Sequence, residues 1–398
     1  MSRVRIIGAG LTGILAAFEA HRLGATAITI EDALDRPGGW SLPRSRQGLE
    51  LRDGEFLFGA GADPIRSALE WRGLAFDEVD LHEGALSPAH DGAAPSWGHG
   101  PLFAGQAPTT EPTTPPTTPP ETLADILRPF PRWAADSLAR HCEWRLGVWI
   151  DEIHAGAAPA LGLTEVRFID SGQPAPEDRP RRAAAPRNGL AGLFAEAGAG
   201  LARLGVAISF HTLVSPREAA LSRRGDDVVV WAADPLALFD LAALPRPRRI
   251  GERVAAYVFR AKLDAPLPLT VRNYTSEGVI STLRAYEFRG ASLVALECVA
   301  EASDADLRRE AQRLGAPFTH RTLELGECLS ANLRTRFSCP SVEAVRRLDQ
   351  LRDHLDRTHE GRFVVAGWES ADAAARIAEM SARLATALGG ASAGRRVA

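Results

Sequence analysis

Three glycines and one acidic residue near the N-terminus have the spacing needed to hold phosphate groups and a ribose. Gly8, Gly10 and Gly13 form a G-x-G-x-x-G sequence, and Glu31 follows eighteen residues after Gly13. The first glycine of such a sequence makes a tight turn, the second lets the backbone approach a pyrophosphate, and the third lets a helix pack closely on a strand. The Glu31 carboxylate would accept hydrogen bonds from an adenosine ribose, and it disfavours a 2′-phosphate. These four residues therefore predict a dinucleotide-binding site.

The segments around these residues have the patterns of a strand, a helix and a second strand. They cover residues 4–7, 14–23 and 27–30. The first is β-branched, the second has an apolar face that ends before Gly24, and the third ends at Glu31. Leu11 and Thr12 would open the helix, whose free N–H groups and positive dipole end attract phosphates. A lone glycine motif is weak, but this complete order of elements predicts a Rossmann-like unit.

The residues after the second strand resemble a longer cofactor motif. They run Asp32-Ala33-Leu34-Asp35-Arg36-Pro37-Gly38-Gly39-Trp40. An acid followed by Arg-x-Gly-Gly resembles the extended FAD fingerprint of the flavoprotein superfamily that holds amine oxidases, protoporphyrinogen oxidase, phytoene desaturases and UDP-galactopyranose mutase. The resemblance implies FAD as the cofactor, with Gly38 and Gly39 passing against its phosphates and ribose. Arg36 would contact a nearby oxygen, and Asp32 and Trp40 are counted with the same site.

The resemblance extends to two later segments. Val214, which follows the predicted strand at residues 206–210, would lie over the FAD adenine through its backbone. Near the C-terminus, Gly367, Trp368 and Glu369 end a strand and precede a helix. In the superfamily that helix points its N-terminus at the flavin pyrimidine ring, where its dipole stabilises negative charge on the reduced flavin. Most relatives have the glycine directly before the acid, so Trp368 is a departure from the pattern.

The recurrence of these cofactor segments predicts an α/β chain with two interleaved domains. One is a discontinuous Rossmann-like FAD-binding domain, and the other is an α+β substrate domain built on an antiparallel sheet. The first covers residues 1–85, 186–250 and 325–398, and the second covers residues 86–185 and 251–324. A Pro/Thr-rich stretch at residues 107–120 cannot pack a core, so we expect it to be a surface loop of the substrate domain.

The composition argues against several classes of protein. The chain has 398 residues with a formal net charge of −4, whereas nucleic-acid binders usually carry a basic surplus. Its four cysteines include no C-x-x-C pair, so neither a metal site nor a disulfide framework is expected. No stretch approaches the roughly 18 uninterrupted apolar residues of a membrane span. We therefore expect a soluble, cytoplasmic protein that acts on a small molecule, and its oligomeric state is not indicated.

The flavin would carry the redox step, and the sequence contains no recognisable catalytic triad. Amine oxidases commonly hold a lysine near the reactive flavin nitrogen, but Lys262 is the only lysine and ends a predicted strand. Sugar-nucleotide mutases carry a histidine-bearing loop where this chain has Gly-Ala-Gly-Ala at residues 59–62, which we expect to lie close to the isoalloxazine. Arg284, Tyr286 and Glu297, on predicted strands of the substrate domain, are candidate pocket residues.

These observations favour an FAD-dependent oxidoreductase that removes hydride from a C–C or C–N bond of an organic substrate. Such a dehydrogenase or oxidase would be similar to protoporphyrinogen oxidase and the desaturases, which lack a fixed acid–base motif. Two alternatives stay open. One is a sugar-nucleotide mutase, an isomerase that works with reduced flavin. The other is a flavin-binding protein without catalytic activity.

Overall fold

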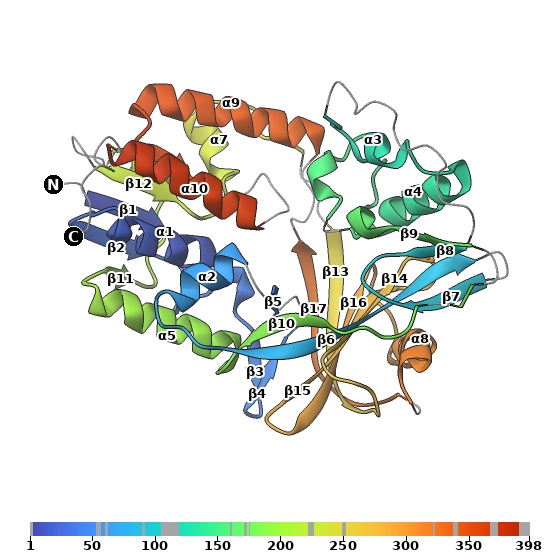
Figure 1. Ribbon diagram of the computed structural model, residues 1–398. Helices are drawn as coiled ribbons and strands as arrows, with labels where there is room; N and C mark the ends of the chain where they lie inside the picture. Colours follow the sequence, from blue (N-terminus) through green and yellow to red (C-terminus); the bar gives the residue numbers. More distant parts are fainter. Residues whose placement is uncertain are drawn as a thin grey trace, which may run out of the picture.

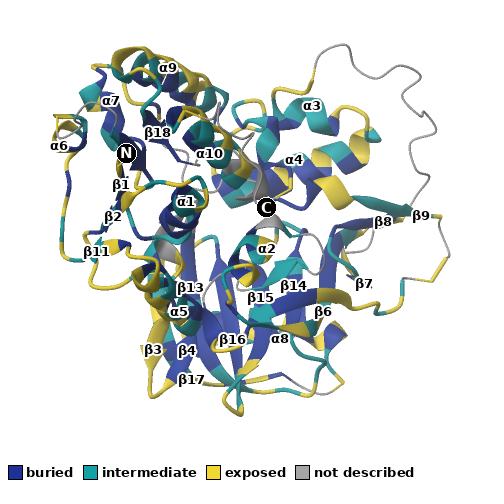
Figure 2. Ribbon diagram, turned by 60° about the vertical axis from the view of Figure 1, so that its left-hand side comes forward, coloured by how far each residue is buried: buried dark blue, intermediate teal, exposed yellow. Residues whose placement is uncertain are grey.

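The chain forms two large β-sheets that lie side by side, one parallel and one mostly antiparallel (Figure 1). The computed structural model describes residues 3–52, 57–59, 63–89, 92–104, 119–159, 161–170, 173–174, 176–221, 227–248, 252–320, 323–336, 341–366 and 373–389. Within this part of the chain, helices cover both sheets, and Figure 2 shows that the strands are mostly buried while the outer helix faces are exposed. The predicted α/β class with a second, antiparallel sheet is confirmed.

The parallel sheet carries the glycine motif. In the described residues its strand order is β11-β2-β1-β12-β18, and every neighbouring pair is parallel. These strands span Ala207–Ser209, Ala27–Glu31, Arg3–Ile7, Val228–Trp231 and Phe363–Val365. Because side chains alternate along a strand, Val4 and Ile6 face one layer of helices while Ile7 faces the other. The strand order also shows that segments far apart in the sequence share one sheet.

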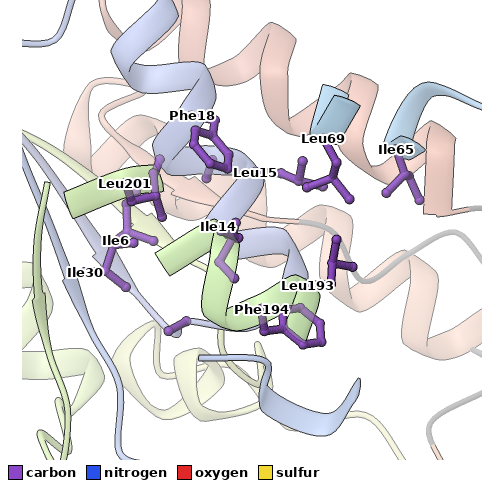
Figure 3. Close-up of a cluster of buried hydrophobic side chains, with 14 of the residues drawn as sticks. Ile6, Ile14, Leu15, Phe18, Ile30, Ile65, Leu69, Leu193, Phe194 and Leu201 are labelled. Carbon is purple, nitrogen blue, oxygen red and sulfur yellow. The ribbon is translucent and has the colours of Figure 1, made fainter. Parts of the chain in front are cut away.

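Helices cover both faces of this sheet. On one face lie α1 (Leu11–Arg22), α5 (Gly189–Arg203) and α10 (Ala373–Ala387). On the other lie α6 (Pro216–Leu221), α7 (Ala237–Leu241) and α9 (Val342–His359). Figure 3 shows the first core, where Ile14 and Phe18 of α1 pack with Ile6 of β1 and Leu193 of α5. Leu69 of α2 (Pro64–Glu70) closes this core beside α1. The apolar face of α1 thus fixes the helix on the sheet.

The second sheet has nine strands among the described residues, in the order β17-β13-β16-β15-β14-β6-β10-β5, with β7 paired to β6. They span Glu324–Arg336, Glu252–Lys262, Ala291–Cys298, Ile280–Phe288, Leu269–Asn273, Phe76–Ala89, Arg181–Pro186, Phe58–Gly59 and Gly92–Trp97. Neighbours are antiparallel except β14 and β6. Helix α8 (Asp304–Gly315) packs on one face through Leu307, Ala311 and Leu314. This sheet is the main element of the second half of the molecule.

Shorter elements complete the molecule. They are α3 (Leu123–Leu127), α4 (Arg132–Leu146), the pair β8 (Leu102–Ala104) and β9 (Arg167–Ile169), and the hairpin β3 (Arg44–Arg46) and β4 (Leu49–Leu51). Figures 1 and 2 place α4 on the side of the nine-stranded sheet opposite α8. No helix in the described ranges is long and apolar enough to cross a membrane.

Two predicted domain boundaries fall on strands of the nine-stranded sheet. Residue 85 lies within β6, and residue 325 lies at the beginning of β17. Strand β17 is joined to β13 by a long antiparallel ladder, so its residues pair with the segment predicted as substrate domain. The domain division stays a prediction. Most of the Pro/Thr-rich stretch, residues 107–118, lies outside the described residues.

Candidate dinucleotide-binding site

The glycine turn is held tightly at its first and third glycines. The N–H of Gly8 donates to the Glu31 carbonyl at 2.8 Å, and Gly8 has a φ of +106°. A Cβ added at Gly13 would lie 1.9 Å from the Gly8 carbonyl oxygen, far inside any normal contact. Helix α1 can therefore approach the β1 turn this closely only because residue 13 has no side chain. The structure supplies a steric reason for both glycines.

Gly10 occupies a different environment. A Cβ added there would meet no described atom within 4 Å. Gly10 is also the N-cap of α1 and, as a glycine, supplies no capping side chain. Leu11 and Thr12 form the first turn, where the backbone N–H groups of a helix lack intrahelical partners. The beginning of α1 thus combines open space with N–H donors, which is the arrangement that binds anions.

Asp32 links the glycine turn to the chain that follows β2. Its carboxylate is buried and accepts the N–H of Ala9 at 2.5 Å and the N–H of Leu34 at 2.7 Å. The sequence predicted Asp32 as a cofactor contact. In the structure it also holds the middle of the turn, so its loss would loosen the loop itself.

Glu31 lies at the carboxyl end of β2, beside the turn, and it is paired with Arg5 of β1. The Arg5 Nε lies 2.5 Å from Glu31 Oε2, and Glu218 of α6 lies 3.5 Å from the same guanidinium. Burial alone would lower the pKa of Arg5, but the two carboxylates raise it overall. The Arg5 charge therefore orients Glu31. Arg5 was not predicted from the sequence, although a charged residue inside a β-branched strand was a signal for it.

Gly38 and Gly39 lie directly against the first glycine turn. The Gly38 N–H donates to the Ala9 carbonyl at 2.9 Å, and Gly38 forms a β-bridge with Gly10. A Cβ on Gly39 would lie 3.2 Å from the Gly10 Cα, and Gly38 and Gly39 both have positive φ. The structure therefore brings both glycine motifs together. A side chain at residue 39 would press on Gly10, and one at residue 38 would press on Phe194.

The other predicted site residues have more varied positions. Arg36 is exposed, and its Nε lies 3.7 Å from Asp35 Oδ1. Trp40 lies in the short 3-10 turn Gly39–Ser41. The Val214 side chain is buried in the core under α7 and α9, which leaves only its backbone for a ligand. Gly367, Trp368 and Glu369 lie outside the described residues. Roles for these positions stay predictions.

The candidate pocket residues lie on the nine-stranded sheet and are all buried. Arg284 and Glu297 form an ion pair with Nη1 and Oε2 3.0 Å apart. Tyr286 is 1% exposed; its hydroxyl accepts the N–H of Arg52 at 2.8 Å and donates to the Glu50 carbonyl at 3.3 Å. Tyr286 therefore joins this sheet to β4. Gly59 is in β5, and the rest of the 59–62 segment lies outside the described residues.

A buried polar joint that the sequence analysis missed surrounds Tyr286. The Glu50 carboxylate lies 2.6 Å from Arg52 Nε and accepts the N–H groups of Leu190 and Ala191, at the first turn of α5. A Cβ on Gly189 would lie 2.5 Å from Glu50 Oε2, and Gly189 has a φ of +73°, so glycine is favoured at that helix start. No local spacing identifies this joint, because its partners are far apart in the sequence.

The comparison with protein families supports the N-terminal assignment. Residues 6–67 match the family described as NAD(P)-binding Rossmann-like domain, and this range contains both glycine motifs and Glu31. No curated protein matches the sequence of the chain. The predicted Rossmann-like dinucleotide-binding unit is therefore confirmed for this segment.

Solved structures with a similar fold can be aligned with nearly the whole chain. A structure of reduced UDP-galactopyranose mutase has a TM-score of 0.66 at 11% identity, covering 98% of this chain and 96% of that one. A protein provisionally assigned as protoporphyrinogen oxidase from Exiguobacterium sp. 255-15 has a TM-score of 0.61 at 15% identity, covering 97% and 98%. A putrescine oxidase with redesigned cofactor binding has a TM-score of 0.55 at 14% identity, covering 98% and 99%. The chain has the fold of these proteins, which confirms the predicted resemblance at that level.

Proposed function

We propose that the chain binds FAD and removes hydride from a C–C or C–N bond of a small organic substrate. The proposal rests on the surroundings of the glycine turn at the beginning of α1. Gly8 and Gly13 are locked by close backbone contacts, while Gly10 leaves the helix N-terminus open. A turn that is fixed at Gly8 and Gly13 and leaves open space beside Gly10 suits a pyrophosphate.

The residues present fit FAD at this end of the molecule. The N–H groups of Leu11 and Thr12 would meet the pyrophosphate, and Glu31, oriented by Arg5, would accept from the ribose. Gly39 lets the adjacent chain lie close to the turn, where an added Cβ would be 3.2 Å from the Gly10 Cα. FAD supplies a hydride acceptor when it is bound. The protein's part is to bind the cofactor, to orient the substrate and to exclude water.

The oxidoreductase assignment draws its support from the arrangement of the two halves. The parallel sheet carries the cofactor motifs, and the nine-stranded sheet contacts it through Tyr286 and Leu293. Two of the similar structures are described as oxidases. We therefore place the substrate against the nine-stranded sheet, on the side that faces the cofactor half.

A sugar-nucleotide mutase is the second candidate, and the likeness to reduced UDP-galactopyranose mutase at a TM-score of 0.66 favours it. The two reactions have different electron balances. An oxidoreductase consumes one equivalent of acceptor for each substrate converted, whereas a mutase returns the flavin to its starting state without net consumption of reductant.

The test begins with the flavin itself. We expect the purified protein, or the protein incubated with FAD, to show flavin absorbance that stays with the chain on gel filtration. Failure to retain FAD would refute the proposal. For holoprotein, substrate-dependent flavin reduction without oxygen supports the oxidoreductase, whereas turnover only after dithionite reduction supports the mutase. A bound flavin that does neither with any tested substrate points to a binding protein.

A further inference from the structure

The parallel sheet has one covered edge and one open edge. At the first edge, β18 is buried: Phe363, Val364 and Val365 are at most 2% exposed, and α9 and α10 pack against the strand. At the other edge, β11 pairs with β2 on its inner side, and no strand among the described residues lies on its outer side. Figure 1 shows β11 at the margin of the molecule, beside α5. The described part of the chain thus leaves this edge uncovered.

The outer side of β11 offers backbone groups for pairing. The Ser209 carbonyl accepts the N–H of Asp32, directly after β2, at 2.9 Å, so the backbone groups of Ser209 point toward β2. Backbone groups of successive strand residues point to opposite sides, and those of Ile208 therefore point outward. Open edges are commonly protected by charged residues or proline. Residues 206–210, Val-Ala-Ile-Ser-Phe, contain neither, so the edge can accept another strand.

A groove of about 400 Å³ lies beside this edge, between β11 and α5. Its lining is apolar and includes Ala195, Gly198, Ala199 and Ala202 of α5 with Ile208 and Phe210 of the β11 segment. The four α5 residues are spaced at i, i+3, i+4 and i+7, so they lie on one face of the helix. Their small side chains let a second helix approach closely. Because β11 itself has only three residues, this groove must supply most of the contact with any partner.

The two ends of the groove carry opposite charges. Arg203 is exposed at the last residue of α5, and its side chain forms no ion pair or hydrogen bond in the part of the chain that the structure describes. Glu196 lies toward the other end, next to Ala195, and its carboxylate accepts only from the Asn188 amide among the described groups. A spacing of seven residues places Arg203 and Glu196 on the same flank of α5.

We propose that the groove and the β11 edge form the interface of a homodimer, so that the occupant is a second copy of this chain. A two-fold axis beside Ile208, perpendicular to the sheet, pairs the two β11 strands in antiparallel fashion. The Ile208 N–H of each copy donates to the Ile208 carbonyl of the other. The same axis sets the two α5 helices antiparallel, with their small residues in contact. The two parallel sheets then continue into one another.

Symmetry accounts for the charges as well. In an antiparallel pair of α5 helices, the end of one groove lies against the opposite end of the other. Arg203 of each copy therefore meets Glu196 of the second copy, and the ion pair occurs twice. A two-fold interface must be complementary to itself, and opposite charges at the two ends of one groove meet that requirement. This inference goes beyond the flavin reaction and does not depend on it.

The first measurement is the mass of the full-length protein in solution, by sedimentation equilibrium with and without FAD. At micromolar concentration we expect twice the 42.7 kDa mass of one chain. Wild-type protein that stays monomeric overturns the inference, whatever else occupies the groove. Retention of FAD is measured on the same samples, so failure of the proposed function and failure of the dimer are separate results.

The variant Ala199→Arg tests the groove. Ala199 is exposed, and arginine is a good helix former, so the chain should keep its fold and its unfolding midpoint in urea. The long charged side chain would enter the closest approach of the two helices. We expect the dissociation constant of the dimer to rise by about a hundredfold or more. The matched control is Ala378→Arg, at an exposed alanine of α10, which should leave the dimer intact. A folded Ala199→Arg protein that dimerises like the wild type overturns the inference.

A charge exchange tests the antiparallel arrangement. Arg203→Glu and Glu196→Arg each bring like charges together at both ends of the interface, so each should weaken the dimer by about tenfold, and less at high salt. The double variant exchanges the two charges and should regain the wild-type affinity. Loss of fold stability alone would not be repaired in this way. If Ala199→Arg does not fold, this exchange decides, because neither charged side chain belongs to the core. A double variant as weak as the single variants overturns the inference.

Discussion

Gly10 and Gly13 belong to one motif, but the structure predicts opposite consequences for replacing them with alanine. At Gly13 the new Cβ would lie 1.9 Å from the Gly8 carbonyl oxygen and 3.0 Å from its carbon. Both atoms are backbone, so α1 itself would have to move away from the turn. Overpacking of this kind costs about 1–3 kcal/mol. We therefore expect Gly13→Ala to destabilise the protein whether or not FAD is present.

At Gly10 the new Cβ would meet no described atom within 4 Å, and the backbone angles of φ −70° and ψ −179° suit alanine. The N-cap preference for glycine over alanine is worth about 0.5 kcal/mol. The cofactor-free Gly10→Ala protein should therefore unfold almost like the wild type. Its methyl group instead enters the space that we assign to the pyrophosphate.

The cofactor separates the two variants quantitatively. FAD present at a hundred times its dissociation constant stabilises the wild type by about 2.7 kcal/mol. A hundredfold weaker Gly10→Ala variant would gain only about 0.4 kcal/mol at the same FAD concentration. Urea unfolding of each protein with and without FAD measures both numbers. The exposed substitution Ala27→Val, at the first residue of β2, serves as the control and should behave like the wild type.

Two results would refute this reasoning. If Gly10→Ala without cofactor loses as much stability as Gly13→Ala, the space beside Gly10 is not open. If Gly10→Ala folds normally and gains the full 2.7 kcal/mol or so from FAD, the pyrophosphate does not lie at the beginning of α1. Either outcome would require a different placement of the cofactor.

Three further substitutions test other parts of the structure. Tyr286→Phe leaves the buried N–H of Arg52 without its 2.8 Å acceptor, so urea unfolding should show a loss of about 1–3 kcal/mol. Glu83→Gln should remove a pH dependence of the unfolding free energy. Burial alone would raise the pKa of Glu83 in the folded protein, but its contacts with His99, Arg272 and Arg181 lower it to about 2, below the ordinary 4.5. Ionised Glu83 therefore contributes about 3 kcal/mol of stability above pH 4.5, and this contribution is lost as the pH falls toward 2. Wild type and variant should therefore differ by that amount at pH 6 and converge at low pH, whereas a constant difference would contradict the assignment. Asp32→Asn leaves one oxygen for the N–H groups of Ala9 and Leu34, and should lower both stability and FAD affinity, by about tenfold for the latter, in a fluorescence titration.

The N-terminal motif could be predicted because each of its parts is local. Gly8, Gly10 and Gly13 are required by contacts within one turn, and Glu31 follows from the length of one helix and one strand. The Rossmann-like unit and the class of the second sheet were therefore accessible from the sequence. Trp40 and Val214 were chosen by resemblance alone, and the Val214 side chain is buried in the core under α7 and α9.

The polar joint could not be predicted, because it depends on pairing across the chain. Glu50 meets Leu190 and Tyr286, residues that lie 140 and 236 positions further along the sequence. Hydrophobic periodicity identifies the strand that carries Tyr286 but not the strand beside it. The domain boundary predicted at residue 325 also depends on pairing across the chain. Only the ladder between β13 and β17 shows which sheet residues 324–336 join.

The order of strands in the parallel sheet also constrains how the chain can assemble during synthesis. Strand β1 lies in the middle of the sheet between β2 and β12, yet β12 leaves the ribosome almost two hundred residues after β2. Until then one hydrogen-bonding edge of β1 is unpaired, and unpaired edges are sites of mispairing. Strand β18 arrives later still, at residues 363–365. The parallel sheet that carries the glycine motif can therefore be completed only after residues 363–365 have been synthesised.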